Sequence, residues 1–380
     1  MIEQLTQEDR KLLRDTAARF FHERSPITAL RQLRDKKDAV GFDPGLWREI
    51  SDMGWAGILI DENDGGVGLG YQALGVILEQ SGRSLAASPF VSTVLSAAPI
   101  ISSAGNPEQR GNALPGVSNG VLVISLAHEE SPRHAPHQIS TRAAKNVDGY
   151  TINGKKTFVL DGHVADLFLL VARTAGQNEE RAGISLFLID SSLPGINIKR
   201  TTMVDSRNAA HIQFDNVQIP ANSIIGKAGY GAEILDPVLD GARAGIASEM
   251  LGTAQKTFDI TIEYLKTREQ FGAPIGSFQA LKHRAAEMFC EIELARSAVY
   301  SALQALDQKA SNTAELVCVA KAKACDMIEL VSNEAVQMHG GVGMTDEANI
   351  GLFLKRARVA QQLFGDVIFH RQRFADLIGI

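Results

Sequence analysis

The sequence has few of the features that mark secreted, membrane-spanning or nucleic-acid-binding proteins. It contains only 3 cysteines, an odd number that argues against a disulfide framework. We therefore expect Cys290, Cys318 and Cys325 to be buried structural thiols. No apolar run approaches the roughly 18 residues that a membrane-spanning helix needs. The net charge of −6 provides no basic surface for nucleic acid or for an anionic membrane.

The chain is nevertheless long enough for a substantial hydrophobic core. Its 380 residues, 45% of them hydrophobic, are typical of a globular protein with two or three domains. The first residues, MIEQLTQEDRKLLRD, are too charged for a signal peptide. These observations predict a cytoplasmic protein.

Residues 1–118 have helical patterns separated by loops. Thr6 is placed to cap a helix through EDRKLLRDTAARFF, with acidic residues in its first turn. The later segment DENDGGVGLG is rich in glycine, but its glycine order does not match G-x-G-x-x-G. We therefore interpret it as a turn before the next helix and not as a dinucleotide site.

Residues 119–228 change to short strand-like runs. The runs, rich in β-branched residues, are VLVISLA, YTINGKKTFVL, LFLLVA, GISLFLID and HIQFDNVQI. Asn153-Gly154 is a strong signal for a type I′ hairpin. Because no helical pattern separates the runs, we predict an antiparallel β-barrel or sandwich.

Residues 229–380 return to helical periodicity. An apolar stripe from Leu235 to Ile262 marks one long helix, and further helices are predicted at about 280–308, 314–338 and after about 348. Four long helices with short connections indicate an antiparallel bundle. The predicted fold is mainly α: an N-terminal helical domain (1–118), a central β-domain (119–228) and a C-terminal four-helix bundle (229–380).

Two stretches of the third block are suited to binding a nucleotide. REQFGAPIGSFQ places Arg268, Phe271 and Gln279 around one turn. Arg268 can bind a phosphate through two hydrogen bonds, and the Phe271 ring can stack on a planar base. In QMHGGVGM, Gln337 is followed by Gly340 and Gly341, which allow close approach of an anion to the backbone. Each stretch also has a structural interpretation, as a helix–helix turn or a helix C-cap.

Together, these stretches and the three-block order resemble the acyl-CoA dehydrogenase family over essentially the whole chain. The resemblance implies FAD bound between the β-domain and the bundle, with a bundle from a neighbouring subunit completing the site, usually in a tetramer. It implies α,β-dehydrogenation of an acyl-CoA thioester, as in fatty acid β-oxidation, with electron-transfer flavoprotein as the electron acceptor. A carboxylate with a pKa raised by burial would remove the proton next to the carbonyl.

The resemblance also assigns roles to individual residues. Arg268 matches the arginine on the FAD pyrophosphate, and Phe271 matches the aromatic residue near the adenine. Gln337, Gly340 and Gly341 match the Q-x-x-G-G element that a neighbouring subunit contributes. Within LDGARAG, Asp240 and Arg243 match the positions that help to hold the CoA nucleotide.

The sequence departs from the family at the catalytic base. Most members carry this base as Glu in an E-G-T sequence, and counting from Arg356 places Gly365 at that position. Asp366 follows one residue later, either as a substitute base or as a residue of a helix-end turn. The second family position for the base is Ala242, which has no carboxylate either.

The flavin-contacting segments of the β-domain depart as well. The family sequence T-E-P-x-A-G-S-D is replaced by HEESPRHA at 128–135, and its Gly-Ser pair becomes Arg133-His134. The W-I-T strand becomes Phe158-Val159-Leu160, which keeps an aromatic residue but loses the Thr hydroxyl. The histidines of this segment lie in a Pro-broken loop, so we predict no metal site.

Three functions are compatible with this pattern. The first is the small, partner subunit of a heteromeric acyl-CoA dehydrogenase, similar to that of pimeloyl-CoA dehydrogenase or of steroid side-chain enzymes, with a large subunit supplying the base. The second is a self-sufficient homomeric enzyme with Asp366 as base. The third is another flavin chemistry, such as oxygenation, or non-catalytic acyl-CoA binding on the same fold.

Overall fold

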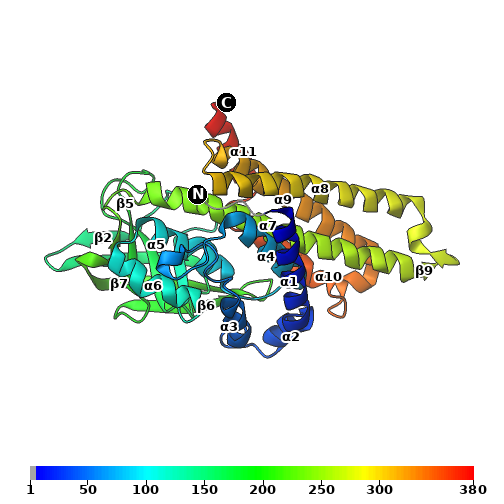
Figure 1. Cartoon of the computed structure of the whole chain (residues 1–380), viewed down its shortest axis with the longest axis horizontal. Coiled ribbons are helices and arrows are strands. Elements are labelled where there is room, and N and C mark those ends of the chain that lie inside the picture. The colour runs from blue at the N-terminus through cyan, green and yellow to red at the C-terminus, as the bar shows by residue number, and fades with distance from the viewer. Residues whose placement is uncertain (1–5) are drawn as a thin grey trace. The chain divides into compact units, whose positions relative to one another are not determined.

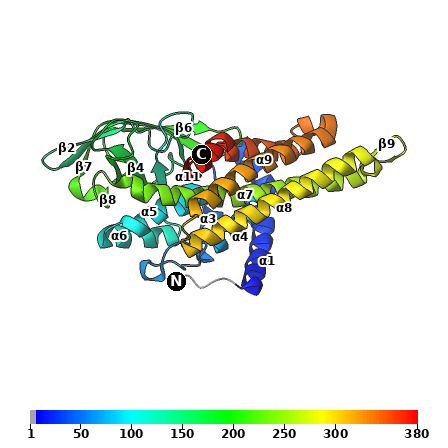
Figure 2. The same ribbon diagram turned by 90° about the horizontal axis from the view of Figure 1, so that it is seen from above.

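The computed structural model describes residues 6–380, and Figures 1 and 2 show its helices and strands. The described chain forms two compact units. The helical unit contains residues 6–36, 71–86 and 243–380, and the β unit contains residues 37–70 and 87–242. The domain boundaries at 118/119 and 228/229 stay predictions.

The helical unit is a helical bundle that combines N-terminal helices with the helices of the C-terminal part of the chain. Its helices are α1 (Gln7–Arg24), α2 (Ile27–Asp35), most of α4 (Gly70–Ser84), the C-terminal part of α7 (Gly231–Thr267), α8 (Gln279–Gln308), α9 (Thr313–His339), α10 (Ile350–Gln362) and α11 (Val367–Ile378). A two-stranded hairpin of β9 (Glu269–Gln270) and β10 (Ala273–Pro274) joins α7 to α8. Figures 1 and 2 show this hairpin at the outer end of both helices. The predicted bundle helices are confirmed.

The N-terminal cap is confirmed as well. The Asp9 backbone N–H donates to Thr6 Oγ1 at 3.1 Å, and the Thr6 N–H donates to the Asp9 carboxylate at 3.1 Å. This reciprocal arrangement is a capping box, which satisfies backbone donors that the first helical turn leaves open.

Close backbone packing and one buried ion pair hold the bundle together. A Cβ on Gly252 of α7 would lie 1.7 Å from the Glu79 carbonyl oxygen of α4, so the two helices can approach only because this residue is glycine. On the same helix, the buried Glu249 carboxylate accepts two hydrogen bonds from Arg356 of α10, at 2.7 and 2.9 Å. Glycine packing and charge pairing therefore fix α7 against its neighbours.

The β unit is built around one eight-stranded sheet. Its strands are β1 (Ile124–Ala127), β2 (Arg142–Lys145), β3 (Gly149–Leu160), β4 (Leu167–Arg173), β5 (Ile184–Asp190), β6 (Ile196–Thr202), β7 (Asn208–Pro220) and β8 (Ile224–Ile225). The helices of this unit are α3 (Pro44–Asp52), α5 (Ala98–Ala104), α6 (Pro107–Ser118) and the start of α7, with a π-helical stretch at Phe90–Ala97. The strand order is β6-β7-β3-β2-β4-β5-β8, and β1 pairs with β4.

The sheet is mostly antiparallel and does not close into a barrel. β1 and β2 instead run parallel to β4, along successive parts of the same edge. Its core is formed by inward-facing side chains such as Ile152, Phe168, Phe187 and Ile212, all of them at most 1% exposed. The sandwich alternative of the predicted β-domain is therefore the correct one.

Two local predictions were wrong. Asn153-Gly154 does not turn a hairpin, because β3 runs through it with a register shift between Ile152 and Gly154, where Gly154 has a φ of +151°. The extra residue of this bulge lies on β7, and glycine is needed at 154 because a Cβ there would lie 2.5 Å from Thr141 Oγ1. Cys290 is exposed, whereas Cys318 and Cys325 are buried as predicted.

Candidate functional site

The turn between α10 and α11 contains the position predicted for the catalytic base. Phe364 and Gly365 both have left-handed backbones, with φ of +58° and +106°. A Cβ on Gly365 would lie 2.4 Å from Phe369 Cδ1 and 3.0 Å from His370 Nε2. A side chain at position 365 would therefore be both strained and obstructed.

Asp366 has a structural role in the same turn. It is the N-cap of α11, and its carboxylate accepts a hydrogen bond of 2.8 Å from the Phe369 backbone N–H. Asp is among the preferred N-cap residues because its oxygen satisfies such an open donor. This geometry matches the interpretation of Asp366 as a helix-end residue.

Two buried cations fix the backbone of this turn. Lys321 of α9 donates to the Gln361 carbonyl at 3.1 Å and to the Gly365 carbonyl at 3.0 Å. Arg243 donates from Nε to the Phe364 carbonyl at 3.1 Å. Burial lowers the pKa of Lys321, because the charged form loses its hydration. The turn therefore has little freedom to rearrange around a new side chain.

Lys321 is a residue that the sequence analysis missed. It is fully buried on α9, between the buried Val317, Ala320 and Ala324. The available signal was a single lysine on the apolar stripe of a helix. A buried lysine needs hydrogen-bond acceptors from outside its own helix, so such a lysine indicates a contact with another segment. The sequence contains no sign that these acceptors lie about 40 residues later.

The residues predicted to hold the CoA nucleotide lie on α7. Asp240 and Arg243 are 6% and 2% exposed, and Ala242 between them is fully buried. Besides its hydrogen bond to the α10–α11 turn, the Arg243 guanidinium lies 5.3 Å from the Phe369 ring centroid. Contacts of Asp240 and Arg243 with CoA stay a prediction.

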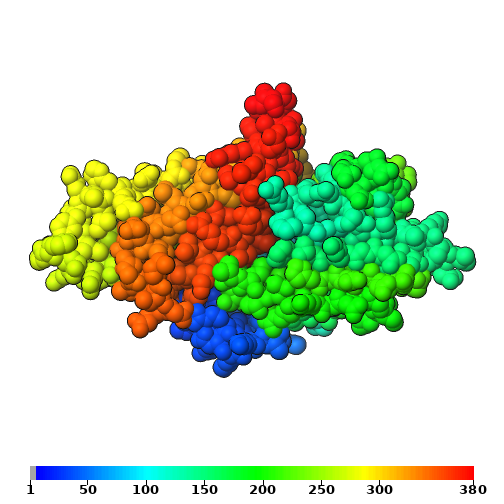
Figure 3. All heavy atoms as spheres, turned by 180° about the vertical axis from the view of Figure 1, so that it is seen from behind, coloured from blue at the N-terminus to red at the C-terminus, as the bar shows by residue number. Residues whose placement is uncertain are grey.

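The hairpin at the end of α7 presents the predicted pyrophosphate and adenine residues to solvent. Phe271 is 94% exposed, and Arg268 and Gln279 are exposed as well. Within residues 6–380 the Arg268 guanidinium makes no ion pair or hydrogen bond, so its donors are available to a ligand. Figure 3 shows this segment in yellow at one end of the helical unit.

The Q-x-x-G-G element lies at the C-terminal end of α9. Gly340 caps the helix with φ +61° and ψ −142°, a combination that essentially only glycine adopts. A Cβ on Gly341 would meet nothing within 4 Å, so packing inside the chain does not require glycine there. The preceding His339 stacks on Tyr264 of α7, with ring centroids 4.4 Å apart, and this anchors the element to the bundle. Gln337 is exposed beside it.

The loop at 128–135 in the β unit is closed by its own charged side chains. The Glu129 carboxylate contacts His134 Nδ1, and His128 Nε2 donates to the Pro136 carbonyl at 2.9 Å. Burial by itself would raise the pKa of Glu129, but His128 and His134 outweigh it and hold the pKa at about 2. The Glu129 carboxylate is therefore paired within the loop, whereas the Arg133 side chain is exposed.

A buried lysine on β3 holds the same loop by hydrogen bonds. Lys156 of β3 donates to the His128 carbonyl at 2.9 Å and to Glu130 at 2.7 Å, and its side chain is fully buried. Burial lowers the pKa of Lys156, and the Glu130 charge opposes this shift. For Glu130, burial would raise the pKa, but Lys156 and hydrogen bonds from Ser140 and Thr141 hold it at about 2.

This pair predicts an acid-sensitive β unit. Because the pKa of Glu130 in the folded chain lies below its ordinary value of 4.5, the stabilising effect of its charge is complete above that pH and is lost as pH falls towards about 2. Glu130→Gln leaves Lys156 unpaired, so we expect a loss of about 3–5 kcal/mol in the free energy of unfolding at pH 7. Urea unfolding at pH 7 and at pH 3 measures the difference in the free energy of unfolding between wild type and Glu130→Gln. This difference should be smaller at pH 3. Asp148→Asn, at an exposed turn, is the control, and an equal loss at both pH values would contradict the prediction.

Phe158 projects from a bulge in β3. Between Lys156 and Val159 the strand has one residue more than β7, and Phe158 has a φ of +50°. Its ring packs edge-on against His211, and 41% of the side chain is exposed. Bulges often redirect a side chain at the edge of a functional site, and this one turns an aromatic ring towards solvent.

Comparisons with known proteins give a consistent result. The acyl-CoA dehydrogenase N-terminal, middle and C-terminal domain models match residues 7–121, 128–217 and 229–376. An acyl-CoA dehydrogenase of Bacillus subtilis (strain 168) is 30% identical over 94% of each chain.

No helix among residues 6–380 has the length and apolar character needed to cross a membrane.

Solved structures agree with these relatives. The Tcur3481-Tcur3483 steroid ACAD is 31% identical, with a TM-score of 0.87 over 98% of each chain. The butyryl-CoA dehydrogenase of Megasphaera elsdenii is 26% identical, with a TM-score of 0.90 over the whole of each chain. Such relatives are FAD-dependent oxidoreductases that act on CH–CH groups. The chain therefore belongs to the acyl-CoA dehydrogenase family.

Proposed function

We propose that this chain is the partner subunit of a heteromeric acyl-CoA dehydrogenase. In this role it completes an FAD site whose remaining part lies on a sister chain, and the sister chain supplies the carboxylate that removes the proton from the acyl-CoA. The observation that carries the proposal is the α10–α11 turn, where Gly365 has no room for a side chain.

The α10–α11 turn supports the absence of a base in this chain. A carboxylate must reach the substrate from a position that tolerates a side chain, and the left-handed Gly365 backbone disfavours every residue except glycine. Ala242, at the other family position, is fully buried and carries no titratable group. The chain thus has no carboxylate at either position where the family places one.

The helical unit fits the role of completing an FAD site. Arg268 has unused donors that can bind a diphosphate, and Phe271 offers an exposed ring for a planar base. The open space at Gly341 lets an anion approach backbone N–H groups next to Gln337. The flavin bound there would accept the hydride. This chain's residues would hold its diphosphate and adenine.

The β unit fits a flavin less well. The Glu129 carboxylate is paired with His134 within its own loop, and the large Arg133 and His134 stand where the resemblance places a small Gly-Ser pair next to the flavin. Leu160 stands where the family has a hydroxyl, and it cannot donate a hydrogen bond. Phe158 alone is available for stacking. This difference between the units supports FAD completion for a sister chain over FAD binding by this chain's own β unit.

The self-sufficient alternative depends on Asp366. Its carboxylate is already the cap of α11, and freeing it would leave the Phe369 N–H without a partner. Nothing in the turn favours this movement, since Lys321 and Arg243 hold the adjacent carbonyls. We therefore rank this alternative below the partner subunit.

One similar solved structure supports the heteromeric proposal. The Tcur3481-Tcur3483 steroid ACAD pairs two protein names, as expected of a two-chain assembly. We extend this arrangement to the present chain, with an acyl-CoA substrate and electron-transfer flavoprotein as acceptor. Acyl-CoA turnover by the co-expressed pair, across dicarboxylic, steroid and fatty thioesters, would identify the acyl class.

Arg268→Gln tests the contribution to FAD. In the complex with the sister chain, we expect FAD affinity to fall roughly tenfold to a hundredfold, since charge-assisted hydrogen bonds contribute about 1.5–3 kcal/mol. FAD titration of the apo complex by fluorescence measures this change. Lys266→Gln, an exposed cation two residues earlier, is the control and should bind FAD normally. Unchanged FAD affinity in Arg268→Gln would contradict the assignment.

A further inference from the structure

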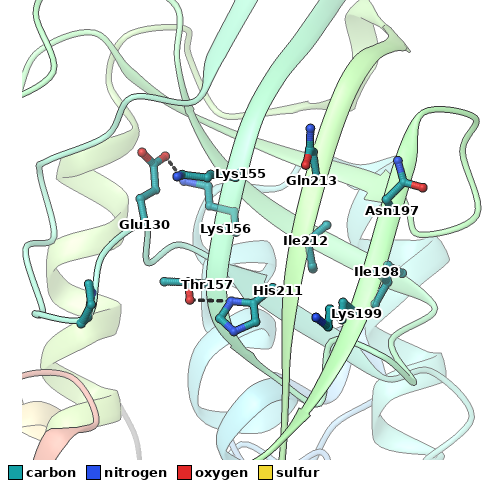
Figure 4. Close-up of a pocket in the computed structure, with 11 residues that line it drawn as sticks. Glu130, Lys155, Lys156, Thr157, Asn197, Ile198, Lys199, His211, Ile212 and Gln213 are labelled. Carbon is teal, nitrogen blue, oxygen red and sulfur yellow. Dashed lines mark hydrogen bonds and ion pairs between the residues drawn. The ribbon is translucent and has the colours of Figure 1, made fainter.

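A groove on the β unit adjoins the loop at 128–135, which supplies Glu130 and Pro132 to its lining, and its His211 packs against Phe158. It contains none of the residues assigned to the FAD diphosphate, the adenine or the CoA nucleotide. It has a volume of about 450 Å³ and lies on three neighbouring strands, with the loop after Glu129 at one side (Figure 4). Its lining residues are Glu130, Pro132, Lys155, Lys156, Thr157, Asn197, Ile198, Lys199, His211, Ile212 and Gln213.

Strand register gathers polar side chains on one face of this groove. Lys155 of β3 lies opposite Gln213 of β7, which in turn lies opposite Asn197 of β6. Two residues along, His211 of β7 lies opposite Lys199 of β6. Because side chains alternate along strands about 4.8 Å apart, these residues share a face in two rows about 7 Å apart. Two lysines therefore stand at opposite corners, with two amides and an imidazole between them.

The positive charge of this groove is not neutralised within the chain. Its one carboxylate, Glu130, is bound to the buried Lys156, as the dashed line in Figure 4 shows. In the part of the chain that the structure describes, neither the Lys155 nor the Lys199 ammonium group has a carboxylate partner. A chain with a net charge of −6 thus presents two unpaired cations in one hollow.

The remaining polar groups are oriented as well. Thr157 Oγ1 is hydrogen-bonded to His211 Nδ1 at 2.7 Å, which fixes the ring and leaves Nε2 directed away from this contact (Figure 4). Gln213 and Asn197 are exposed and carry amide N–H donors. The groove therefore combines two cations with several neutral donors, a set that suits an anion with many oxygen atoms.

We propose that this groove binds a small molecule that carries a phosphate or diphosphate group. Lys155 and Lys199 neutralise its charge from the two outer strands, and the Gln213 and Asn197 amides donate to its oxygens. The volume of the groove lies in the range of about 300–1,000 Å³ that is usual for small-molecule sites. Inorganic pyrophosphate and a nucleoside diphosphate share this chemistry.

Calorimetric titration of the full chain with pyrophosphate and with ADP tests the proposal. Wild type should bind at least one of them, and the double variant Lys155→Gln/Lys199→Gln should bind it at least about tenfold more weakly. Lys145→Gln, an exposed lysine on β2 of the same unit, is the matched control and should bind normally. Since these lysines are exposed, the thermal unfolding temperature of the variants should not change.

Two further arms locate and identify the ligand. Arg268→Gln should retain binding, because it alters the proposed FAD residue and leaves the groove intact. ADP binding more tightly than pyrophosphate would identify a nucleotide, whereas equal binding would identify the diphosphate alone, and both support the proposal. No binding to wild type at low-millimolar concentration, or equal weakening by Lys145→Gln, would overturn it. The proposal would also be overturned if Arg268→Gln lost ligand binding while the Lys155→Gln/Lys199→Gln variant kept it in full.

Discussion

Gly365→Glu is expected to destabilise the chain and to confer no dehydrogenase activity on it. The variant introduces the residue that the family resemblance predicts at this position, but the backbone at position 365 has a φ of +106°. A non-glycine residue in such a conformation costs about 1–3 kcal/mol. The Cβ contact of 2.4 Å with Phe369 adds overpacking of about 1–3 kcal/mol.

Urea unfolding and an acyl-CoA dehydrogenase assay on the FAD-supplemented chain measure these two effects. Gly351→Ala is the control, since this glycine lies in the preceding helix α10 and its Cβ would meet nothing within 4 Å. Alanine should stabilise that helix by about 0.5–1 kcal/mol. A stable Gly365→Glu chain with new activity would show that the turn can accept a base.

Glu249→Gln is expected to cause a stability loss of about 3–5 kcal/mol, because it leaves a buried cation without its partner. The Arg356 guanidinium is 4% exposed and gives two hydrogen bonds to the Glu249 carboxylate. This pair joins α7 to α10, immediately before the α10–α11 turn. We therefore expect the variant to unfold at a clearly lower urea concentration.

The double variant Glu249→Leu/Arg356→Met separates charge pairing from packing. Apolar replacement of a whole buried pair is often neutral or stabilising, so the double variant should recover most of the loss in the free energy of unfolding. Arg371→Gln breaks an exposed pair with Asp326 and should cost less than about 1 kcal/mol. If Glu249→Gln lowered the free energy of unfolding no more than Arg371→Gln does, the buried pair would not be a major contribution to the stability of the bundle.

The sequence predicted the bundle helices well because their apolar residues repeat with helical spacing over many turns. It left Asp366 open between a substitute base and a helix-end residue, and the structure makes this residue the N-cap of α11. The helix–helix turn that contains Arg268 and Phe271 was also one of the two interpretations of that stretch, and the structure has the β9–β10 hairpin there. Each of these inferences depends on residues close together in the chain.

The remaining features depend on contacts between distant residues. β2 and β6 were missed because RAAK and INIKRTT are short or polar, and a partner strand supplies their regularity. Cys290 was expected to be buried, but the stripe of α8 contains Met288 and Ile292 and leaves it outside. The rigidity of the α10–α11 turn depends on Lys321, whose acceptors lie on another helix and its following turn.

The visible absorption spectrum of the chain purified alone, before and after addition of an acyl-CoA, tests the partner-subunit proposal most directly. We predict no bound flavin in the chain alone, and flavin that bleaches with acyl-CoA when the chain is purified with its sister chain. A chain that carries flavin by itself and bleaches on addition of an acyl-CoA would contradict the proposal.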